Sequence, residues 1–243
     1  MLIEELRGVY YILLKDLRAY YFKPPNISWG ILFPLTLALA FSLRNPVGLA
    51  ELAPGLIAMA AVFGTTSMEA IVITFERRTG ALERLLLAPI SLKAILMGKV
   101  LGGTVFGLMI SGVMTVISMT FFQMRVLNPP LFSVSLLLTL MALSSLGAFV
   151  AVSVKEVFEA QTLSNYFRFP MIFLCGVFIP IEAMPPPLRA VAYFLPLTYS
   201  VDALREVTLG VSALGSLLDV IALSLFLTAF LAIANGLLKR SLR

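Results

Sequence analysis

The sequence predicts an all-α integral membrane protein with six transmembrane helices. Apolar residues make up 60% of its 243 residues and charged residues only 13%, whereas soluble domains are about a quarter charged. The mean hydropathy is +0.99, and no polar stretch is long enough to build a separate soluble core. We therefore expect a single membrane domain over residues 1–243.

Residues 1–25 predict an amphipathic helix that lies on the membrane surface. Apolar residues recur here at every third or fourth position, while Lys15 and Arg18 fall on the opposite side. A basic face suits the headgroups of membrane lipid, and the tyrosines of this segment suit the interface. Pro24 and Pro25 are expected to break the helix before the chain enters the bilayer. A solvated surface helix is the alternative.

Six later segments are candidates to cross the membrane, since a crossing needs roughly 20 apolar residues. The fifth segment is the least apolar because Gln161, Asn165 and Arg168 interrupt its first half. The expected spans are residues 27–43, 52–75, 94–122, 131–154, 160–179 and 217–238.

Between spans five and six, residues 180–216 are too polar and too rich in proline for another crossing. Apolar residues keep helical spacing over 188–197 and 204–211. We therefore expect short extracellular re-entrant helices in this region.

The distribution of basic residues predicts the orientation. Six spans place both termini on one side, and cytoplasmic termini would put 14 of the 18 Lys and Arg residues inside. This excess follows the positive-inside rule and predicts a multi-pass plasma-membrane protein. The four that remain outside are Arg44, Arg125, Arg189 and Arg205.

The residue inventory excludes several classes of function. The chain has no His and a single Cys, which rules out a Ser-His-Asp triad, a zinc cluster and an internal disulfide. Basic residues lie between apolar segments, which is not the pattern of a nucleic-acid surface. The Gly98–Lys99 pair precedes Val100, and Lys93 stands where a P-loop needs its first glycine. We expect no catalytic residue, metal or cofactor in this chain.

The loop over residues 76–93 predicts a short amphipathic helix between spans two and three. Glu76 and Glu83 lie seven residues apart on one helical face, and the leucines at 82, 85 and 86 would form an apolar knob. Such a knob needs a hydrophobic socket on lipid or on a soluble partner. A plain surface helix is the alternative.

Residues 75–90 resemble the cytoplasmic loop of type-2 ATP-binding-cassette exporter permeases, whose pattern is approximately E-R-x-x-G-x-L-E-x-L-L-x-x-P. Residues 169–180, with Met184 and Pro185, resemble the fifth helix and outer loop of that family, and residues 195–210 resemble the segment that follows. The resemblance covers essentially the whole chain. It is closest to the small exporters of drugs, lipids and polysaccharides, which include multidrug efflux systems.

This resemblance implies a permease subunit that moves a hydrophobic or amphipathic substrate outward, whether drug, lipid or glycan. Two permeases would pair, as a homodimer or a heterodimer, and each would rest on a cytoplasmic ATPase subunit that binds ATP and Mg. The leucines of the loop would fill a groove on the ATPase, while Gly80 would permit the turn into the coupling helix. The implied coupling residues are Glu76, Arg77, Gly80, Leu82, Glu83, Arg84, Leu85 and Leu86.

Two charged residues fall at membrane depth, where a charge costs roughly 3 kcal/mol on insertion scales. They are Glu69 in the second span and Arg168 in the fifth. Gln161, Asn165 and Arg168 recur every three or four residues and predict a polar stripe that is a candidate substrate path, with Glu69 as the partner of Arg168. The alternative is that both charges snorkel to the cytoplasmic interface.

The third expected span contains two pairs of closely spaced glycines. Gly98 with Gly102, and Gly103 with Gly107, form small-xxx-small pairs that pack helices closely, within the bundle or at a dimer seam.

Gly176 and Pro180 are expected to break the fifth span near the outer surface. The break is a candidate hinge or gate, and an ordinary helix end is the alternative.

Two other classes of membrane protein remain as alternatives. A passive channel or an assembly factor would use the loop knob to bind some other soluble protein. A secondary transporter is disfavoured because the chain has no His and few intramembrane acids. The channel is disfavoured because no acidic ring or repeated pore loop is visible.

Overall fold

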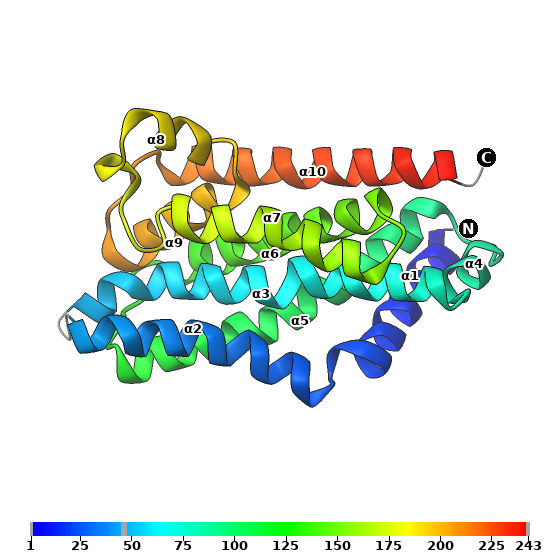
Figure 1. Ribbon diagram of the computed structural model, residues 1–243, viewed down its shortest axis with the longest axis horizontal. Coiled ribbons are helices and arrows are strands. Elements are labelled where there is room, and N and C mark those ends of the chain that lie inside the picture. The colour runs from blue at the N-terminus through cyan, green and yellow to red at the C-terminus, as the bar shows by residue number, and fades with distance from the viewer. Residues whose placement is uncertain (1, 45–47, 242–243) are drawn as a thin grey trace.

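The computed structural model describes residues 2–44 and 48–241, and every regular element within them is helical. Long helices lie alongside one another, with the N-terminus, the C-terminal end and α4 (Ala81–Leu86) at one end of the bundle and α8 (Pro186–Ala192) at the other (Figure 1). The long helices are α2 (Pro24–Arg44), α3 (Leu49–Arg78), α5 (Leu92–Phe121), α6 (Pro129–Ser153), α7 (Val157–Leu174) and α10 (Ser216–Ser241).

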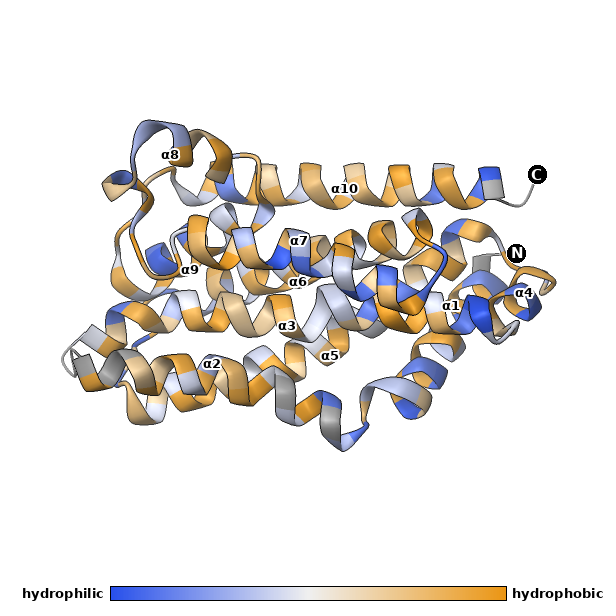
Figure 2. Ribbon diagram, in the orientation of Figure 1, coloured by the Kyte–Doolittle hydropathy of each residue, from blue (hydrophilic) through white to orange (hydrophobic). Residues whose placement is uncertain are grey.

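A helix forms at each of the six expected spans, and four of these helices are long and apolar enough to cross a membrane. These four are α3, α5, α6 and α10, and Figure 2 shows the predominance of hydrophobic residues clearly along α10. In α2 the apolar stretch is shorter, Asn26–Ala40. In α7 the polar residues of the first half lower the hydropathy. The fold is therefore that of a multi-pass membrane protein, while the full count of six crossings stays a prediction.

Helix α3 is the centre of the bundle, because its residues are buried almost without interruption from Ala53 to Glu76. Glycine lets neighbouring backbones approach it closely. A Cβ at Gly55 would lie 2.5 Å from the carbonyl oxygen of Val177, and a Cβ at Gly64 would lie 3.0 Å from the Cα of Gly107. The core is thus built on contacts that only a missing side chain permits.

The small-residue pairs of α5 pack inside this chain. A Cβ at Gly98 would lie 3.0 Å from Ile12, and one at Gly102 would lie 3.5 Å from Tyr21, both in the N-terminal segment. Gly103 and Gly107 face α6 and α3. The dimer-seam interpretation of these glycines is therefore wrong, since helices of the same chain already occupy their faces.

Helix α10 lies on the outside of the bundle, where it packs on α6 and α9 (Pro196–Leu209) (Figure 1). Of the residues in its most apolar 18-residue stretch, only 17% are buried. Leu217, Leu225 and Ile233 are exposed, whereas Leu223 and Ala234 are fully buried. One face of α10 therefore packs on protein, and the other suits lipid.

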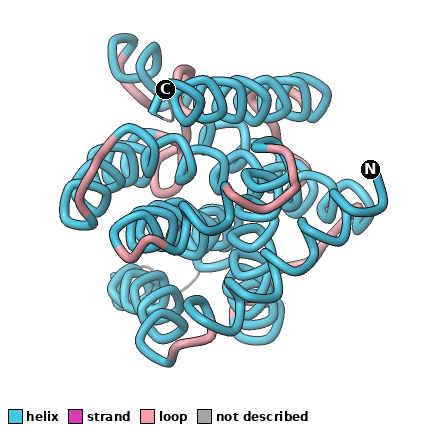
Figure 3. The backbone as a smooth tube through the Cα atoms, turned by 90° about the vertical axis from the view of Figure 1, so that its right-hand side faces the viewer, coloured by secondary structure: helices cyan, strands magenta, loops and turns pink. Residues whose placement is uncertain are grey.

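The N-terminal segment forms α1 (Leu2–Asp16) and continues as one π-helical turn, η1 (Leu17–Tyr21). The end-on view in Figure 3 places the N-terminus at the edge of the bundle. Tyr10 is exposed, as an interfacial residue should be, but Tyr21 is fully buried. Pro24 opens α2 instead of merely ending the first helix, because a proline in a first turn lacks only an N–H that has no partner there.

Residues 180–216 contain η3 (Ile181–Ala183), α8 and α9. The short helices expected here are present, and α9 is longer and more buried than its sequence indicated. Its Asp202 carboxylate accepts hydrogen bonds from Ser212 Oγ at 2.8 Å, from Ala213 N at 2.8 Å and from Leu214 N at 2.9 Å. Asp202 thereby fastens the loop before α10 onto α9. The re-entrant character of η3, α8 and α9 stays a prediction.

Candidate functional site

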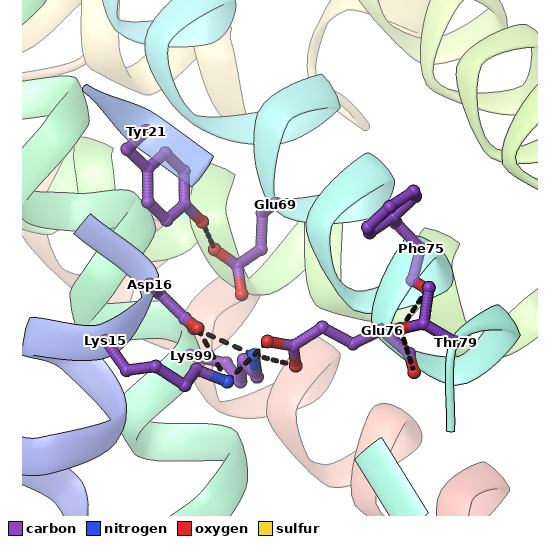
Figure 4. Close-up of polar contacts among 8 residues, drawn as sticks. All are labelled: Lys15, Asp16, Tyr21, Glu69, Phe75, Glu76, Thr79 and Lys99. Carbon is purple, nitrogen blue, oxygen red and sulfur yellow. Dashed lines mark hydrogen bonds and ion pairs between the residues drawn. The ribbon is translucent and has the colours of Figure 1, made fainter. Parts of the chain in front are cut away.

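Four charged residues from three helices meet where α1 ends (Figure 4). Lys99 Nζ on α5 donates to Asp16 Oδ2 at 2.8 Å and to Glu76 Oε2 on α3. Lys15 Nζ lies 3.0 Å from Asp16 Oδ1 and donates to Glu76 Oε1. We call Lys15, Asp16, Glu76 and Lys99 the charge cluster. It ties the N-terminal helix to two helices of the bundle.

The charge cluster is almost closed to solvent. Asp16 and Glu76 are fully buried and Lys99 is 1% exposed, while the Lys15 side chain is 38% exposed. Burial raises the pKa of the Asp16 carboxyl, against the opposing effect of Lys99. Two ammonium groups offset two carboxylates, so the cluster is neutral as a unit. Loss of any one member would leave a buried charge without compensation.

A second buried contact joins the π-helical turn to α3. Tyr21 OH donates to Glu69 Oε2, and both side chains are fully buried (Figure 4). Room for this contact comes from Gly103 on α5, where a Cβ would lie 2.6 Å from Glu69 Oε2 and 2.3 Å from Ser144 Oγ. A π turn shifts the residues that follow it around the helix, and such turns are frequent at functional sites. Here the turn ends on the buried Tyr21.

Helix α4 follows directly on α3. Gly80 adopts the left-handed conformation, with φ 71°, which reverses the chain sharply between the two helices. Arg77 braces the turn by donating from Nη1 to the carbonyl oxygen of Val154 at 2.8 Å. Leu82 packs inward with Ile73 and its neighbours. The position of α4 is therefore set by the core of the helix bundle itself.

The exposed surface of α4 differs from the expected leucine knob. Leu82 is only 3% exposed and belongs to the core, and Leu85 and Leu86 are half-buried. Leu87, which is not among the expected coupling residues, is 87% exposed. Glu83 and Arg84 are exposed beside it. A six-residue helix has too few turns to present all three leucines outward, because one face must cover the end of the bundle.

Arg168 lies deep in the bundle, against α3. Its guanidinium carbon stands 4.2 Å from the ring centroid of Phe63, and Nη1 lies 3.4 Å from Asn165 Oδ1. Phe63 is near the midpoint of α3, roughly 22 Å from either end at about 1.5 Å per residue. A cavity of about 200 Å³ borders Arg168 and Gln161. The interpretation that Arg168 snorkels to the interface is therefore wrong.

Comparison with known proteins decides the family. The family profile described as ABC-2 type transporter matches residues 7–209. This chain belongs to the ABC-2 type transporter family. The resemblance found in the sequence is thus confirmed, and the chain is a transport permease of this family.

Relatives of this ABC-2 permease include the inner membrane transport permease YadH of Escherichia coli K12, which is 26% identical over 190 residues, 77% of this chain and 73% of its own length. Nodulation protein J of Neorhizobium galegae is 27% identical over 216 residues, 87% of this chain and 82% of that protein. Nodulation protein J of Rhizobium leguminosarum bv. viciae is 32% identical over 73 residues, 30% of this chain and 28% of that protein.

The polar residues of the candidate path in the ABC-2 permease come together only in part. Gln161, Asn165 and Arg168 lie along α7, and Asn165 contacts Arg168. Glu69 bonds Tyr21, and within the described residues it forms no ion pair with Arg168. Glu69 is also fully buried, so the snorkelling alternative is wrong for this residue too.

The candidate gate of the permease is the end of α7. The helix stops at Leu174, and Gly176 follows with φ 83°, which ends it in the usual way. Pro180 precedes η3. The break near the outer surface is present, and a gating role for it stays a prediction.

Four residues of the site were not selected from the sequence as functional: Lys15, Asp16, Tyr21 and Lys99. Lys99 lies about two turns into α5, between Gly98 and Gly102. An ion flanked by small residues inside an apolar helix is a signal of a buried partner. The partners themselves come from the distant N-terminal segment, which no local pattern indicates.

Proposed function

We propose that this ABC-2 permease is the membrane subunit of an exporter that carries a hydrophobic or amphipathic substrate outward. A separate cytoplasmic ATPase supplies the energy, and a second permease subunit completes the transporter. The N-terminus, the C-terminal end and α4 share one end of the bundle, which in this proposal faces the cytoplasm.

The observation that carries the coupling proposal is the connection of α4 to the centre of the fold. Helix α4 joins α3 through Gly80 and is packed on it through Leu82, so a displacement of α4 moves the central helix. Glu76 of the charge cluster lies two residues before Arg78, the last residue of α3. Because Lys99 contacts both Glu76 and Asp16, the cluster transmits that displacement to α1 and α5. Packed elements of this kind move as rigid units.

The contact with the ATPase is assigned to the exposed residues of the loop. Leu87 is the apolar anchor, since a single exposed leucine fits a small hydrophobic socket on a partner. Glu83 and Arg84 beside it orient the partner through charge. In this proposal Leu82 acts from inside, by holding α4 in place.

Co-purification tests the proposal. Tagged permease is extracted in mild detergent with candidate ATPases from the same cell, and ATP hydrolysis is measured in liposomes with and without the permease. We expect Leu87→Glu to lower ATPase association about tenfold or more, the loss typical of a binding hot spot. The melting temperature should stay unchanged because the Leu87 side chain is 87% exposed.

Val211→Glu is the matched control, because Val211 is 64% exposed in the loop before α10, at the other end of the bundle. It should leave ATPase association intact. If no ATPase associates with a stable wild-type permease, the coupling proposal fails and a passive channel or assembly factor becomes the better explanation. If Leu87→Glu binds like the wild type, the docking residue is wrong.

A further inference from the structure

Arg168 is a buried cation that lacks a carboxylate partner. Its side chain is 4% exposed, and it forms no ion pair with any residue that the structure describes. Its Nε atom has no hydrogen-bond partner there, and Asn165 Oδ1 at 3.4 Å is a weak acceptor. Buried guanidinium groups are normally paired, because a charge at membrane depth is costly. The face of the Phe63 ring, 4.2 Å from the guanidinium carbon, offsets only part of this cost. A group from outside the chain would supply the rest.

The cavity beside Arg168 is built to hold polar oxygen atoms at one place. It has a volume of about 200 Å³ and lies between α2, α3 and α7. Its polar lining comprises Arg168, Gln161, Asn26 and Ser67, and the Ser67 hydroxyl is buried with no hydrogen-bond partner among the described residues. Two unused donors therefore border one space.

The chemistry of these donors selects an anion. A guanidinium and a hydroxyl both donate to oxygen, and a carboxylate or a phosphate accepts such bonds most strongly. Among the described residues no acidic side chain lines the cavity, and Glu69 bonds Tyr21 instead. A neutral ligand would leave the buried charge uncompensated.

The size of the cavity limits what it can enclose. Drug-sized ligands need about 300–1,000 Å³, so about 200 Å³ holds a headgroup but not a long hydrocarbon body. Met68 and Ile71 line the cavity and are half-buried, which gives it an apolar rim. An attached chain would leave the cavity past this rim and lie among apolar side chains.

We propose that Arg168 and Ser67 hold the acidic headgroup of an anionic amphiphile, and that this is the class of substrate that the permease carries. The inference rests on the proposed export function. The same chemistry could be met by a single-chain acidic amphiphile or by an anionic phospholipid of the bilayer. The experiment distinguishes these two sources.

Binding is measured on the full-length permease, captured on scintillation beads in phosphatidylcholine nanodiscs, with tritiated palmitate as the probe. Unlabelled palmitamide, a neutral analogue of the same length, competes in parallel with unlabelled palmitate. We expect palmitate to compete at least roughly tenfold better than palmitamide, the advantage of one charge-assisted hydrogen bond. Equal competition by the two would overturn the proposal.

Variants assign the preference to this cavity. Arg168→Gln should abolish the preference for the acid, Arg168→Lys should keep part of it, and Ser67→Ala should weaken palmitate binding roughly three- to tenfold. Arg205→Gln, at the α9 end of the bundle, is the control and should bind as the wild type does. A preference that survives in folded Arg168→Gln would refute the assignment, and Ser67→Ala provides the test if that variant does not fold.

Two further comparisons are made. One separates a single-chain amphiphile from a bilayer phospholipid, and the other separates this inference from the proposed export function. Displacement of the bound tritiated palmitate by phosphatidylglycerol at lower concentrations than by unlabelled palmitate would identify the preferred occupant as bilayer lipid, which would overturn the transported-substrate part of the inference. Competition by palmitate alone supports it. The assay needs no ATPase, so failure of ATPase docking refutes only the proposed function, whereas loss of the acid preference with docking intact refutes only this inference.

Discussion

Replacement of Lys99 by methionine tests whether the charge cluster holds the N-terminal helix on the bundle. Lys99 Nζ donates hydrogen bonds to both Asp16 and Glu76, and all three side chains are almost fully buried. Without it, two buried carboxylates share the single ammonium group of Lys15. Breaking a buried ion pair by removing one partner costs about 3–5 kcal/mol.

The assay is thermal unfolding of the detergent-solubilised permease, followed by the loss of its monodisperse elution peak. For a chain of this length 1 kcal/mol corresponds to about 2–4 °C in melting temperature, so Lys99→Met should melt about 6–20 °C below the wild type. The double variant Lys99→Met with Asp16→Asn restores a neutral cluster. It should recover part of the loss, because Lys15 then pairs with Glu76 alone.

Lys93→Met provides the matched control, because Lys93 is exposed one residue into the same helix. A surface change of this kind is usually within about 0.5 kcal/mol. The reasoning is refuted if Lys99→Met melts within about 2 °C of Lys93→Met. It is also refuted if the double variant is less stable than Lys99→Met, because charge compensation would then not be what Lys99 supplies.

Two further substitutions test the contacts beneath the charge cluster. Gly103→Ala places a Cβ 2.3 Å from Ser144 Oγ and should destabilise the fold by about 1–3 kcal/mol, measured as a lower melting temperature. Gly112→Ala, where nothing lies within 4 Å, should be neutral, and equal melting of the two would contradict the packing argument. Tyr21→Phe should cost about 1–3 kcal/mol because it leaves Glu69 buried without its donor. Addition of Glu69→Gln should recover part of that loss, and no recovery would count against the pairing.

The contacts of η1 suggest how the N-terminal segment takes part in transport. Asp16 immediately precedes the π turn and Tyr21 ends it, and both reach buried partners on α3 or α5. Single π turns inside α-helices are rare and are frequent at functional sites. In the proposed function, the bond between Tyr21 and Glu69 would pass a displacement of α3 to this turn, next to the start of α2.

The sequence alone determined the class of the protein and the approximate positions of its six long helices. Apolar runs of about 20 residues place helices because each backbone hydrogen bond in lipid must be satisfied within the segment. Turn residues such as Gly80 and Gly176 also act locally, through backbone conformations that favour glycine. The loop motif over residues 75–90 indicated the family, because a local pattern of charges and leucines is readable without knowledge of its neighbours.

The tertiary structure decided which polar residues meet. Lys99 and Asp16 are 83 positions apart in the chain, and Tyr21 and Glu69 are 48 apart, so no helical period relates them. It also turned Leu82 inward and left Leu87 exposed, since the face that α4 presents depends on the helices against which it packs. Arg168 was recognised from the sequence as a costly charge, but its pairing was not, because compensation of a buried charge depends on what surrounds it in space.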